Sequence, residues 1–404
     1  MDINDTLCGL LKERGITSVI IKGRQMTDEM VLAMNKLLNG SKICLLELFE
    51  AQLQGNKIDV LLHNLHTNIT LKILRLPYND LGIEGIKHLC GSLSINKTLQ
   101  ELSLEGNEIE EESLSLLCSC GPDLCLTSLS LANCNLQPPG GTHIANLLKS
   151  NTTLKSLGLP GNELKLEGIT PISQALRNNT LLTSLDLSNN LLGVPGINTL
   201  CNSLLHNTTL QTLDVASNQI GEGIIEIAQL LVFNKTIQSI GLRDNRPPRK
   251  RLTPTLWKFF QLIGNRPTFT TVNIRKNILP GDGEYPSMIL TVLKNNYMFH
   301  IHQDFVFDRL CSEGFKLFNK MNQVKRASFD WLAHWSTLDS SFQETILFLT
   351  LISNKPSSSL SLLTKDTLSH FFSYLIFAMA PRQFNWDNSK IQSLIATYCH
   401  YNPQ

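Results

Sequence analysis

The sequence predicts an α/β solenoid, in which each turn contributes one short strand to an inner parallel sheet and one helix to an outer layer. Three observations predict this fold. An eleven-residue pattern, L-x-x-L-x-L-x-x-N-x-L, recurs along most of the chain, mostly at intervals of 27 or 28 residues. An asparagine stands at the same place in seven of the ten copies. Each copy is followed by a segment whose apolar residues have the spacing of one helical face.

The copies are numbered here in steps, with step 0 at the first leucine. The clearest copies begin at Leu71, Leu99, Leu126, Leu154, Leu182 and Leu210, and weaker ones at Ile16, Ile43, Ile237 and Phe269. The apolar residues at steps 0, 3, 5 and 10 are expected to point into the solenoid. No turn can bury its apolar face alone, so the turns must be stabilised by stacking on their neighbours.

The asparagine at step 8 has a structural explanation. Its side chain can satisfy backbone groups where the chain leaves the strand, and we expect such bonds to run as a ladder along the array. The residues in question are Asn79, Asn107, Asn162, Asn190, Asn218, Asn245 and Asn277, with Cys134 taking the place in one turn.

The second half of each copy predicts a helix. A glycine recurs at step 14, as in Gly85 and Gly168, and we place it just before the helix. Apolar or small residues follow at steps 18, 19 and 22, as in Leu89, Cys90 and Leu93. An inner sheet backed by wider helices must curve into a horseshoe.

The 28-residue, helix-bearing period and the N-x-T-L junctions between copies resemble the ribonuclease-inhibitor-like class of leucine-rich repeats. The resemblance covers roughly residues 16 to 295 and implies the fold. A chain with such repeats and a separate helical end also resembles the leucine-rich repeat effectors that intracellular bacterial pathogens deliver into host cells. That second resemblance implies a virulence protein secreted into a host cell without a cleaved signal peptide.

The pattern divides the chain into three parts. Residues 1–15 are expected to form a capping helix, residues 16–299 about ten repeats, and residues 300–404 an all-α domain. The turn that begins at Ile237 spans 32 residues and carries a basic insertion, with Arg246, Arg249, Lys250 and Arg251. After about residue 296 the pattern ends and aromatic residues become frequent.

Composition restricts the function. A formal net charge of +1 with 17% charged residues provides no basic field for nucleic acid or anionic membranes. Phe371 to Ala380, the most apolar run, is too short to span a bilayer. The start of the chain lacks the features of a secretory signal, and ten cysteines fit no disulfide framework. We expect a cytoplasmic protein with reduced thiols.

Cysteines and asparagines that suggest chemistry are explained by the repeat. Four cysteines close together in the sequence are candidate zinc ligands: Cys118, Cys120, Cys125 and Cys134. The repeat pattern explains all of them except Cys120. We therefore predict structural thiols, with neither a metal nor a cofactor. Six N-x-[ST] sequences fall at repeat junctions and are likewise attributed to the repeat: Asn68, Asn96, Asn151, Asn178, Asn207 and Asn234.

We predict a non-enzymatic interaction scaffold that binds a partner protein on its concave sheet face. If the chain is a bacterial effector, that partner is a host protein. Side chains at steps 2, 4 and 6 face away from the leucines. At these steps the early turns carry acidic and aromatic side chains, and the late turns carry charged ones. The middle turns carry small residues, such as Ser128, Ser156 and Gly158. The predicted partner-binding residues are Glu47, Phe49, Arg75, Tyr78, Glu101, Glu105, Asp186, Asp214, Arg243 and Arg275.

Two alternative functions lie in the C-terminal part. Leu363 to Leu375 resembles the opening of an F-box, L-P-x-E-L-L-x-x-I-F-S-Y-L, with Thr364 in place of the proline. The resemblance implies a ubiquitin-ligase substrate adaptor that docks on a cullin-ligase adaptor. The other alternative is an enzyme that uses Cys311, His334 and His370 as a cysteine–histidine site.

Overall fold

The computed structural model describes residues 16–23, 25–39, 42–245, 252–263, 271–274, 277 and 300–302. The chain divides into two compact units, Met1–Pro248 and Arg249–Gln404. This division falls within the basic insertion. The expected capping helix at 1–15 and nearly all of the expected helical domain at 300–404 lie outside the described residues, and the three-part division stays a prediction.

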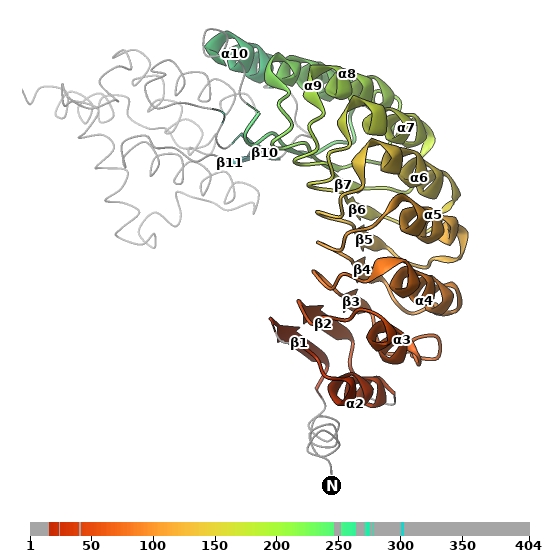
Figure 1. The fold of residues 1–404 in the computed structure, drawn as a ribbon. Coiled ribbons are helices and arrows are strands. Elements are labelled where there is room, and N and C mark those ends of the chain that lie inside the picture. Colours follow the sequence, from red (N-terminus) through yellow and green to blue (C-terminus); the bar gives the residue numbers. More distant parts are fainter. Residues whose placement is uncertain are drawn as a thin grey trace, which may run out of the picture. The chain divides into compact units, whose positions relative to one another are not determined.

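In the first unit strands and helices alternate along the chain (Figure 1). The strands are β1 (Ser18–Lys22), β2 (Leu45–Phe49), β3 (Ile73–Arg75), β4 (Glu101–Ser103), β5 (Ser128–Ser130), β6 (Ser156–Gly158), β7 (Ser184–Asp186), β8 (Thr212–Asp214) and β9 (Ser239–Gly241). The helices are α2 (Asp28–Leu38), α3 (Asn56–Leu62), α4 (Gly82–Ile95), α5 (Glu111–Ser119), α6 (Gln137–Ser150), α7 (Lys165–Asn178), α8 (Gly193–Leu204) and α9 (Ile224–Phe233), with short 3-10 helices η1 (Gly121–Asp123) and η2 (Gly221–Gly223).

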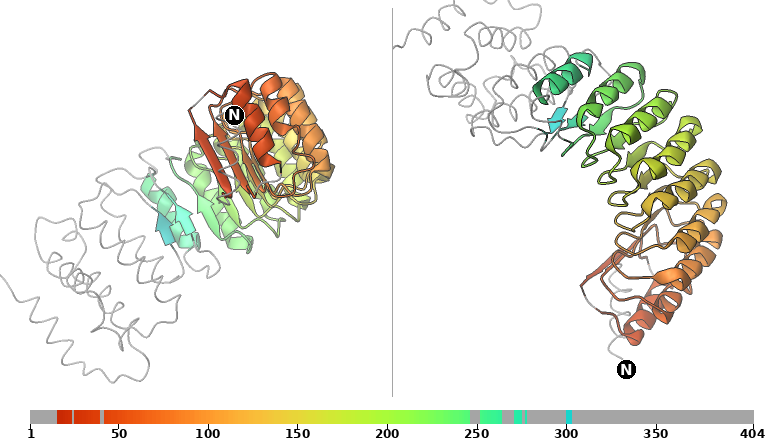
Figure 2. Two further views of the ribbon diagram at one scale, coloured as in Figure 1. Left: turned by 90° about the horizontal axis from the view of Figure 1, so that it is seen from below. Right: turned by 45° about the horizontal axis from the view of Figure 1, so that its top comes forward.

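The strands of this unit form one parallel sheet in sequence order. Each strand from β1 to β8 pairs with the next. Equivalent steps are in register, so that Leu74 lies opposite Leu102, and Leu102 opposite Leu129. The sheet lines the inner side of the curve and the helices cover its outer side (Figures 1 and 2). The predicted α/β repeat architecture is confirmed.

The second unit contains α10 (Leu252–Ile263), β10 (Thr271–Asn273) and β11 (His300–His302). Strands β10 and β11 pair in parallel, with Val272 opposite Ile301. Residues 300–302 therefore form a strand, although they were assigned above to the start of an all-α domain. A weak copy of the repeat that begins at Met298 would place its strand at this point.

Leucine burial follows the pattern. The apolar residues at steps 0, 3, 5 and 10 of the copies that begin at Ile43 to Leu210 are at most 5% exposed. In the copies that begin at Ile43 to Leu182 the helix positions at steps 18, 19 and 22 are buried as well, as in Ile172, Ser173 and Leu176 of α7. In the copy that begins at Leu210 the buried positions lie one residue earlier, at Ile227, Ala228 and Leu231. The core therefore lies between the sheet and the helices, and the opposite face of the sheet is available for other roles.

The step-8 asparagines form the expected ladder. Asn190 is fully buried, and its Nδ2 donates to the carbonyls of Leu159 at 2.8 Å and Leu187 at 3.0 Å. Its own backbone N–H donates to Oδ1 of Asn218 at 2.9 Å, in the next turn. In the turn that begins at Leu126, where a cysteine replaces the asparagine, the Cys134 thiol donates to the Leu104 carbonyl at 3.2 Å.

A second asparagine ladder runs along the junctions between helix and strand. Nδ2 of Asn207 donates to the carbonyls of Leu176 at 2.8 Å and Asn179 at 3.0 Å, while its Oδ1 accepts from the N–H of Leu210 at 2.8 Å. Equivalent bonds are made by Asn68, Asn96, Asn151 and Asn234. In the turn that begins at Leu182 the residue is Asn179, not Asn178, because Asn179 stands three residues before the leucine as its equivalents do. The attribution of Asn178 to this position is wrong by one residue.

The step-14 glycines lie inside helices rather than before them. Gly85, for example, is the fourth residue of α4. A Cβ at Gly85 would lie 3.1 Å from Cβ of Leu81 and 3.2 Å from Cγ2 of Ile58 in the preceding turn. Gly168 and Gly196 are equally crowded. The glycine therefore permits close packing of the helix on its neighbour.

Candidate protein-binding surface

The side chains on the concave face come from alternate residues of each strand. In most strands from β2 to β9 the central residue is buried and its neighbours are half-buried, as in Glu101, Leu102 and Ser103 of β4. The half-buried residues are those at steps 2 and 4, as predicted. The parallel register places them in two rows across the sheet.

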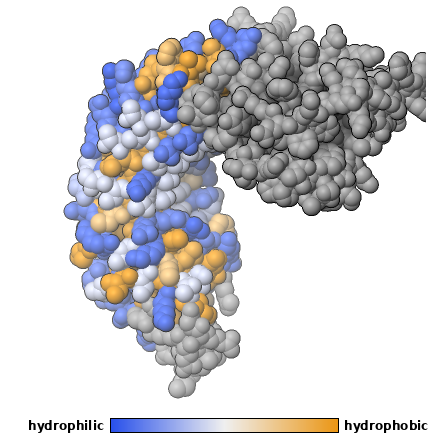
Figure 3. Space-filling view, turned by 180° about the vertical axis from the view of Figure 1, so that it is seen from behind, coloured by the Kyte–Doolittle hydropathy of each residue, from blue (hydrophilic) through white to orange (hydrophobic). Residues whose placement is uncertain are grey.

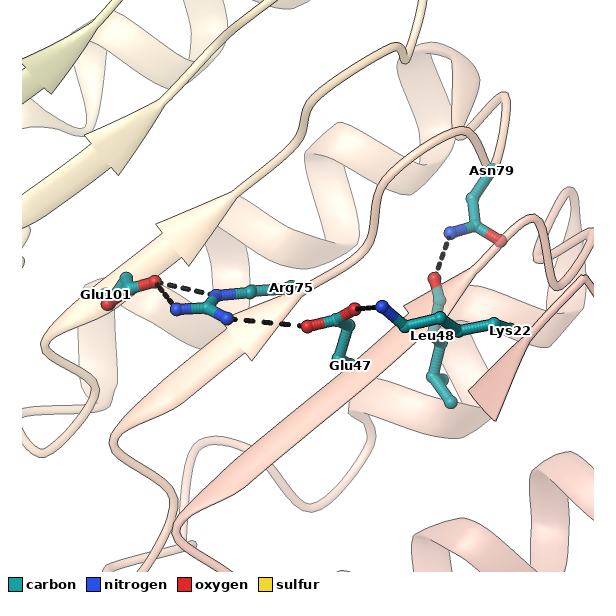
Figure 4. A network of polar contacts seen from close by, with 6 residues as sticks. All are labelled: Lys22, Glu47, Leu48, Arg75, Asn79 and Glu101. Atoms are coloured by element: carbon teal, nitrogen blue, oxygen red, sulfur yellow. Dashed lines mark hydrogen bonds and ion pairs between the residues drawn. The ribbon is translucent and has the colours of Figure 1, made fainter. Parts of the chain in front are cut away.

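A chain of ion pairs crosses the first strands of this face (Figure 4). Nζ of Lys22 lies 3.0 Å from Oε1 of Glu47, and Nη1 of Arg75 lies 3.4 Å from Oε2 of the same carboxylate. On its other side Arg75 contacts Oε1 of Glu101 through Nη2 at 2.7 Å and Nε at 2.8 Å. The predicted residues Glu47, Arg75 and Glu101 thus lie together.

The ion pairs change the pKa values of the residues that form them. The hydrogen bond from Lys22 lowers the pKa of Glu47, and partial burial opposes this effect. The hydrogen bond to Glu101 raises the pKa of Arg75. Lys22 was not among the predicted site residues, although it stands at step 6 of the copy that begins at Ile16. The same step count that identified Phe49 would have found it.

Two predicted aromatic residues meet beside the ion pairs. The ring centroids of Phe49 and Tyr78 lie 5.2 Å apart, with an interplanar angle of 54°. Tyr78 is 41% exposed, and Phe49 is half-buried. Glu105, at the end of the next strand, accepts the backbone N–H of Tyr78 at its carbonyl at 2.8 Å. Phe49, Tyr78 and Glu105 therefore share one part of the surface.

Small polar side chains fill the middle of the face. Ser128, Ser156, Ser184, Thr212 and Ser239 lie in register at step 2 of β5 to β9. The next row holds Ser130 and Gly158. A small centre at Ser128, Ser156 and Gly158 was predicted from the sequence, but the hydroxyl row extends further, through Ser184 and Thr212 to Ser239.

Asp186 and Asp214 lie opposite each other on β7 and β8. Each accepts a backbone N–H at 2.8 Å, from Ser188 and Ala216 respectively. Burial raises the pKa of Asp214, and the negative charge of Asp186 adds to the shift. The carboxylate of Asp214 leans over Gly241, where a Cβ would lie 2.3 Å from its Cγ. This pair is separated from the ion-pair chain by β5 and β6.

Of the two remaining predicted residues, the structure describes Arg243. Arg243 is exposed just after β9, and its positive charge partly offsets the raised pKa of Asp214. Arg275 and the insertion residues Arg246 to Arg251 lie outside the described residues. The assignment of these residues to partner binding stays a prediction.

The cysteine positions match the repeat. Cys118 and Cys134 are buried, and burial raises the pKa of each thiol to about 12. Within the described ranges, no three His, Cys, Asp or Glu side chains are placed to hold a metal ion. Cys311, His334, His370 and Leu363 to Leu375, which carry the alternative functions, lie outside the part of the chain that the structure describes.

The visible surface of the first unit is mixed in character. Hydrophilic residues separate small hydrophobic patches (Figure 3). Among the helices of the described residues, none is both long and apolar enough to span a bilayer.

Comparisons with known proteins agree with the repeat. A family model for the leucine-rich repeat matches residues 96–118, 124–145, 178–201 and 206–228. Pig ribonuclease inhibitor is 36% identical over 86 residues, which cover 21% of this chain and 19% of the inhibitor. Human NACHT, LRR and PYD domains-containing protein 13 is 33% identical over 92 residues, 22% of this chain and 9% of that protein. The chain thus spans no more than about a fifth of the length of these relatives.

Solved structures with similar arrangements have low TM-scores. The TLR13-ssRNA13 complex gives a TM-score of 0.41 at 20% identity, covering 72% of this chain and 36% of that one. The actin-binding site 2 of leiomodin-1 gives 0.31 at 24% identity, covering 37% and 89%.

The strand–helix repeat, its asparagine ladder and the matched segments show that the first unit consists of leucine-rich repeats. Its repeats are of the ribonuclease-inhibitor-like class, with a helix in each turn and sequence similarity to the pig and mouse inhibitors.

Proposed function

We propose that the chain is a non-enzymatic protein-interaction module and that its concave sheet face binds a partner protein. One observation carries the proposal: β1 to β9 turn their leucines toward the helices and leave a continuous opposite face of charged, aromatic and hydroxyl side chains. Ribonuclease inhibitor, by its name, acts on another protein, a ribonuclease. Within the part of the chain that the structure describes, no helix covers this face, which is therefore suited to binding a partner protein.

Substitutions that obstruct the concave face with bulky side chains test this function. Ser128→Arg with Ser156→Arg places two long side chains in the middle of the face, where both serines are half-buried. Thr142→Arg with Gln174→Arg places the same charges on exposed positions of α6 and α7 and is the matched control. Full-length versions would be used for affinity capture from a eukaryotic lysate, followed by mass spectrometry.

We expect the concave variant to lose partners that the wild type and the helix variant retain. Circular dichroism and melting curves would show that both variants fold. Equal partner sets for all three proteins would contradict a concave binding site.

We further propose that the partner is a host protein and that the chain acts as a bacterial effector in the host cytoplasm. The likeness to effector repeats, stated from the sequence, supports this role. A translocation reporter fused to the chain in an intracellular pathogen would test it, and failure to reach the host cytosol would count against it.

The F-box-like sequence from Leu363 to Leu375 favours a second candidate function, that of a ubiquitin-ligase substrate adaptor. The repeats would then select the substrate. Purified full-length chain should bind a purified cullin-ligase adaptor, and Leu375→Asp should weaken that binding. An adaptor that does not bind the wild-type chain would remove this candidate.

A further inference from the structure

We propose that the concave surface around Phe49 and Tyr78 binds a segment of the partner protein that presents an arginine or lysine side chain beside an apolar side chain. This surface is called the aromatic site and consists of Ile20, Phe49, Glu50, Tyr78 and Glu105. The inference deepens the proposed function and rests on it, because it assigns a chemistry to the partner of the same face.

The ring of Tyr78 is held in a fixed position while part of it faces solvent. It contacts the ring of Phe49 on one side. It also lies against the backbone of Gly106, where an added Cβ would be 2.4 Å from Cδ1 and Cε1 of the tyrosine. The backbone of Tyr78 is left-handed, with a φ of 57°, and its N–H is bonded to Glu105. A ring that is already ordered loses little entropy on binding, so it is suited to anchor a partner.

Apolar side chains lie beside the ring. Phe49 is half-buried, and Ile20 of β1, which is 54% exposed, stands two residues before Lys22, the residue that pairs with Phe49. An aliphatic side chain of a partner would bury apolar area against these two residues. Elsewhere on the concave face, β5 to β8 hold hydroxyl, carboxylate and small side chains at steps 2 and 4. The apolar anchor is therefore confined to the first strands.

The charge around the aromatic site is negative. Among the described residues at the concave and strand-end positions of β1 to β4, the acids outnumber the bases: the acids are Glu47, Glu50, Glu101 and Glu105, and the bases are Lys22 and Arg75. Both bases already contact Glu47 or Glu101. Within the described residues, no ion pair joins Glu50 or Glu105 to a base. Those two carboxylates remain for a cation from outside.

The two features together select a basic side chain. A guanidinium or ammonium over the face of a tyrosine ring gains a cation–π interaction, and adjacent carboxylates add an ionic one. An acidic segment or a nucleic acid backbone would instead meet repulsion. Binding of a basic side chain next to an aliphatic one uses the ring, the carboxylates and the apolar neighbours at once.

Substitutions found in other turns of this chain provide variants that should fold. Tyr78→Asn places at step 7 the residue found there in two other turns, Asn133 and Asn189, which are also left-handed at φ values of 53° and 55°. Glu105→Ser reproduces Ser188 at step 6. Phe233→Ala is the control, because it removes an aromatic side chain that is 71% exposed at the end of α9.

The test uses full-length chain and a random-sequence peptide library displayed on phage. We expect the selected peptides to share arginine or lysine next to an aliphatic or aromatic residue. A synthetic peptide of the selected sequence should bind the wild type and the Phe233→Ala variant equally. Its binding to the Tyr78→Asn and Glu105→Ser variants should be about tenfold weaker or more.

Three results would overturn the inference: the selected peptides are acidic, no basic–apolar peptide is selected, or the selected peptide binds the wild type and the Tyr78→Asn variant equally. Peptide binding that is lost in the Ser128→Arg, Ser156→Arg variant but not in Tyr78→Asn would overturn it while leaving the concave function intact. Binding unaffected by any concave variant would count against both. Concentration-dependent self-association that Tyr78→Asn abolishes would assign the surface to a second copy of the chain and also overturn the proposal.

Discussion

At the residue scale, buried asparagine side chains form hydrogen bonds with backbone groups that the turn between strand and helix leaves without partners. The backbone reverses between the strand and the helix of each turn, and left-handed residues recur beside the asparagine, as in Asn189 and Leu191 on either side of Asn190. Such a backbone leaves N–H and C=O groups without partners of their own. One amide can donate twice and accept, so it satisfies several of these groups. The residue at step 8 is therefore fixed by hydrogen bonding rather than by function.

Asn190→Ala should lower the free energy of unfolding by about 3 kcal/mol, because it leaves buried carbonyls and N–H groups without partners. The affected groups include the Leu159 and Leu187 carbonyls and the Leu164 N–H. Asn202→Ala, at an exposed position of α8, should change it by no more than about 0.5 kcal/mol. Urea denaturation of both variants measures the difference. Equal stabilities would show that the ladder contributes nothing.

Two carboxylates on the concave face should respond to pH in opposite ways. Burial raises the folded-state pKa of Asp214, so its ionised form destabilises the fold, and stability falls as pH rises from the unfolded pKa through the folded one. The Lys22 hydrogen bond lowers the folded-state pKa of Glu47, so its contribution is present above the unfolded pKa and is lost as pH falls through the folded one.

Asp214→Asn should therefore be at least as stable as the wild type at neutral pH, and the difference should shrink on acidification through the raised pKa. Glu47→Gln should be less stable at neutral pH, by up to about 1 kcal/mol because the pair is near the surface, and its deficit should also shrink toward low pH. Urea denaturation across a pH series gives both curves. The same sign of effect for the two variants at neutral pH would refute the argument.

At the element scale, the glycines of the helices decide how closely neighbouring turns approach. α6 has two consecutive glycines, and a Cβ at the second, Gly141, would lie 2.1 Å from the carbonyl oxygen of Gly168 in α7. The contact is with backbone, which cannot move aside as a side chain can. Helices α6 and α7 therefore approach each other more closely than any side chain at this position would permit.

Gly141→Ala should destabilise the protein by at least about 2 kcal/mol, because the new methyl group forces α6 and α7 apart. Gly91→Ala is the matched control: Gly91 is exposed within α4 and a Cβ there would meet nothing within 4 Å. Alanine favours a helix over glycine, so this variant should gain up to about 1 kcal/mol. Thermal and urea unfolding report both changes, and a stabilised Gly141→Ala variant would contradict the packing.

The sequence was sufficient to predict the repeat because each step has one physical requirement. Leucines at steps 3 and 5 must be buried and the asparagine at step 8 must form hydrogen bonds. The sequence was insufficient where two neighbouring residues could both serve as the junction asparagine, as Asn178 and Asn179 could. It was also insufficient at Gly85, because a glycine can stand either before a helix or inside it where helices pack closely. The Phe49–Tyr78 contact joins step 6 of one turn to step 7 of the next, and depends on side-chain directions that the repeat does not specify.

At the scale of the whole molecule, the residues that stabilise the first unit are largely distinct from those on its concave face. Leucines, asparagines and glycines fix the interior, so most of them cannot vary with the partner. The concave rows carry few structural duties and differ from turn to turn: ion pairs at β1 to β4, hydroxyls at β5 to β9 and the acidic pair at β7 and β8. A one-dimensional array of this kind builds a long surface from short repeats that stabilise one another by stacking.

Site-specific photo-crosslinking tests the central claim, that the concave face binds the partner, most directly. A photoreactive amino acid would replace Ser156 on β6 in one full-length protein, and Gln174 on the exposed side of α7 in another. After irradiation in a eukaryotic lysate, the protein labelled at 156 should form a covalent adduct with a specific partner, and the one labelled at 174 should not. Adducts from 174 alone, or the same adducts from both positions, would contradict a concave binding surface.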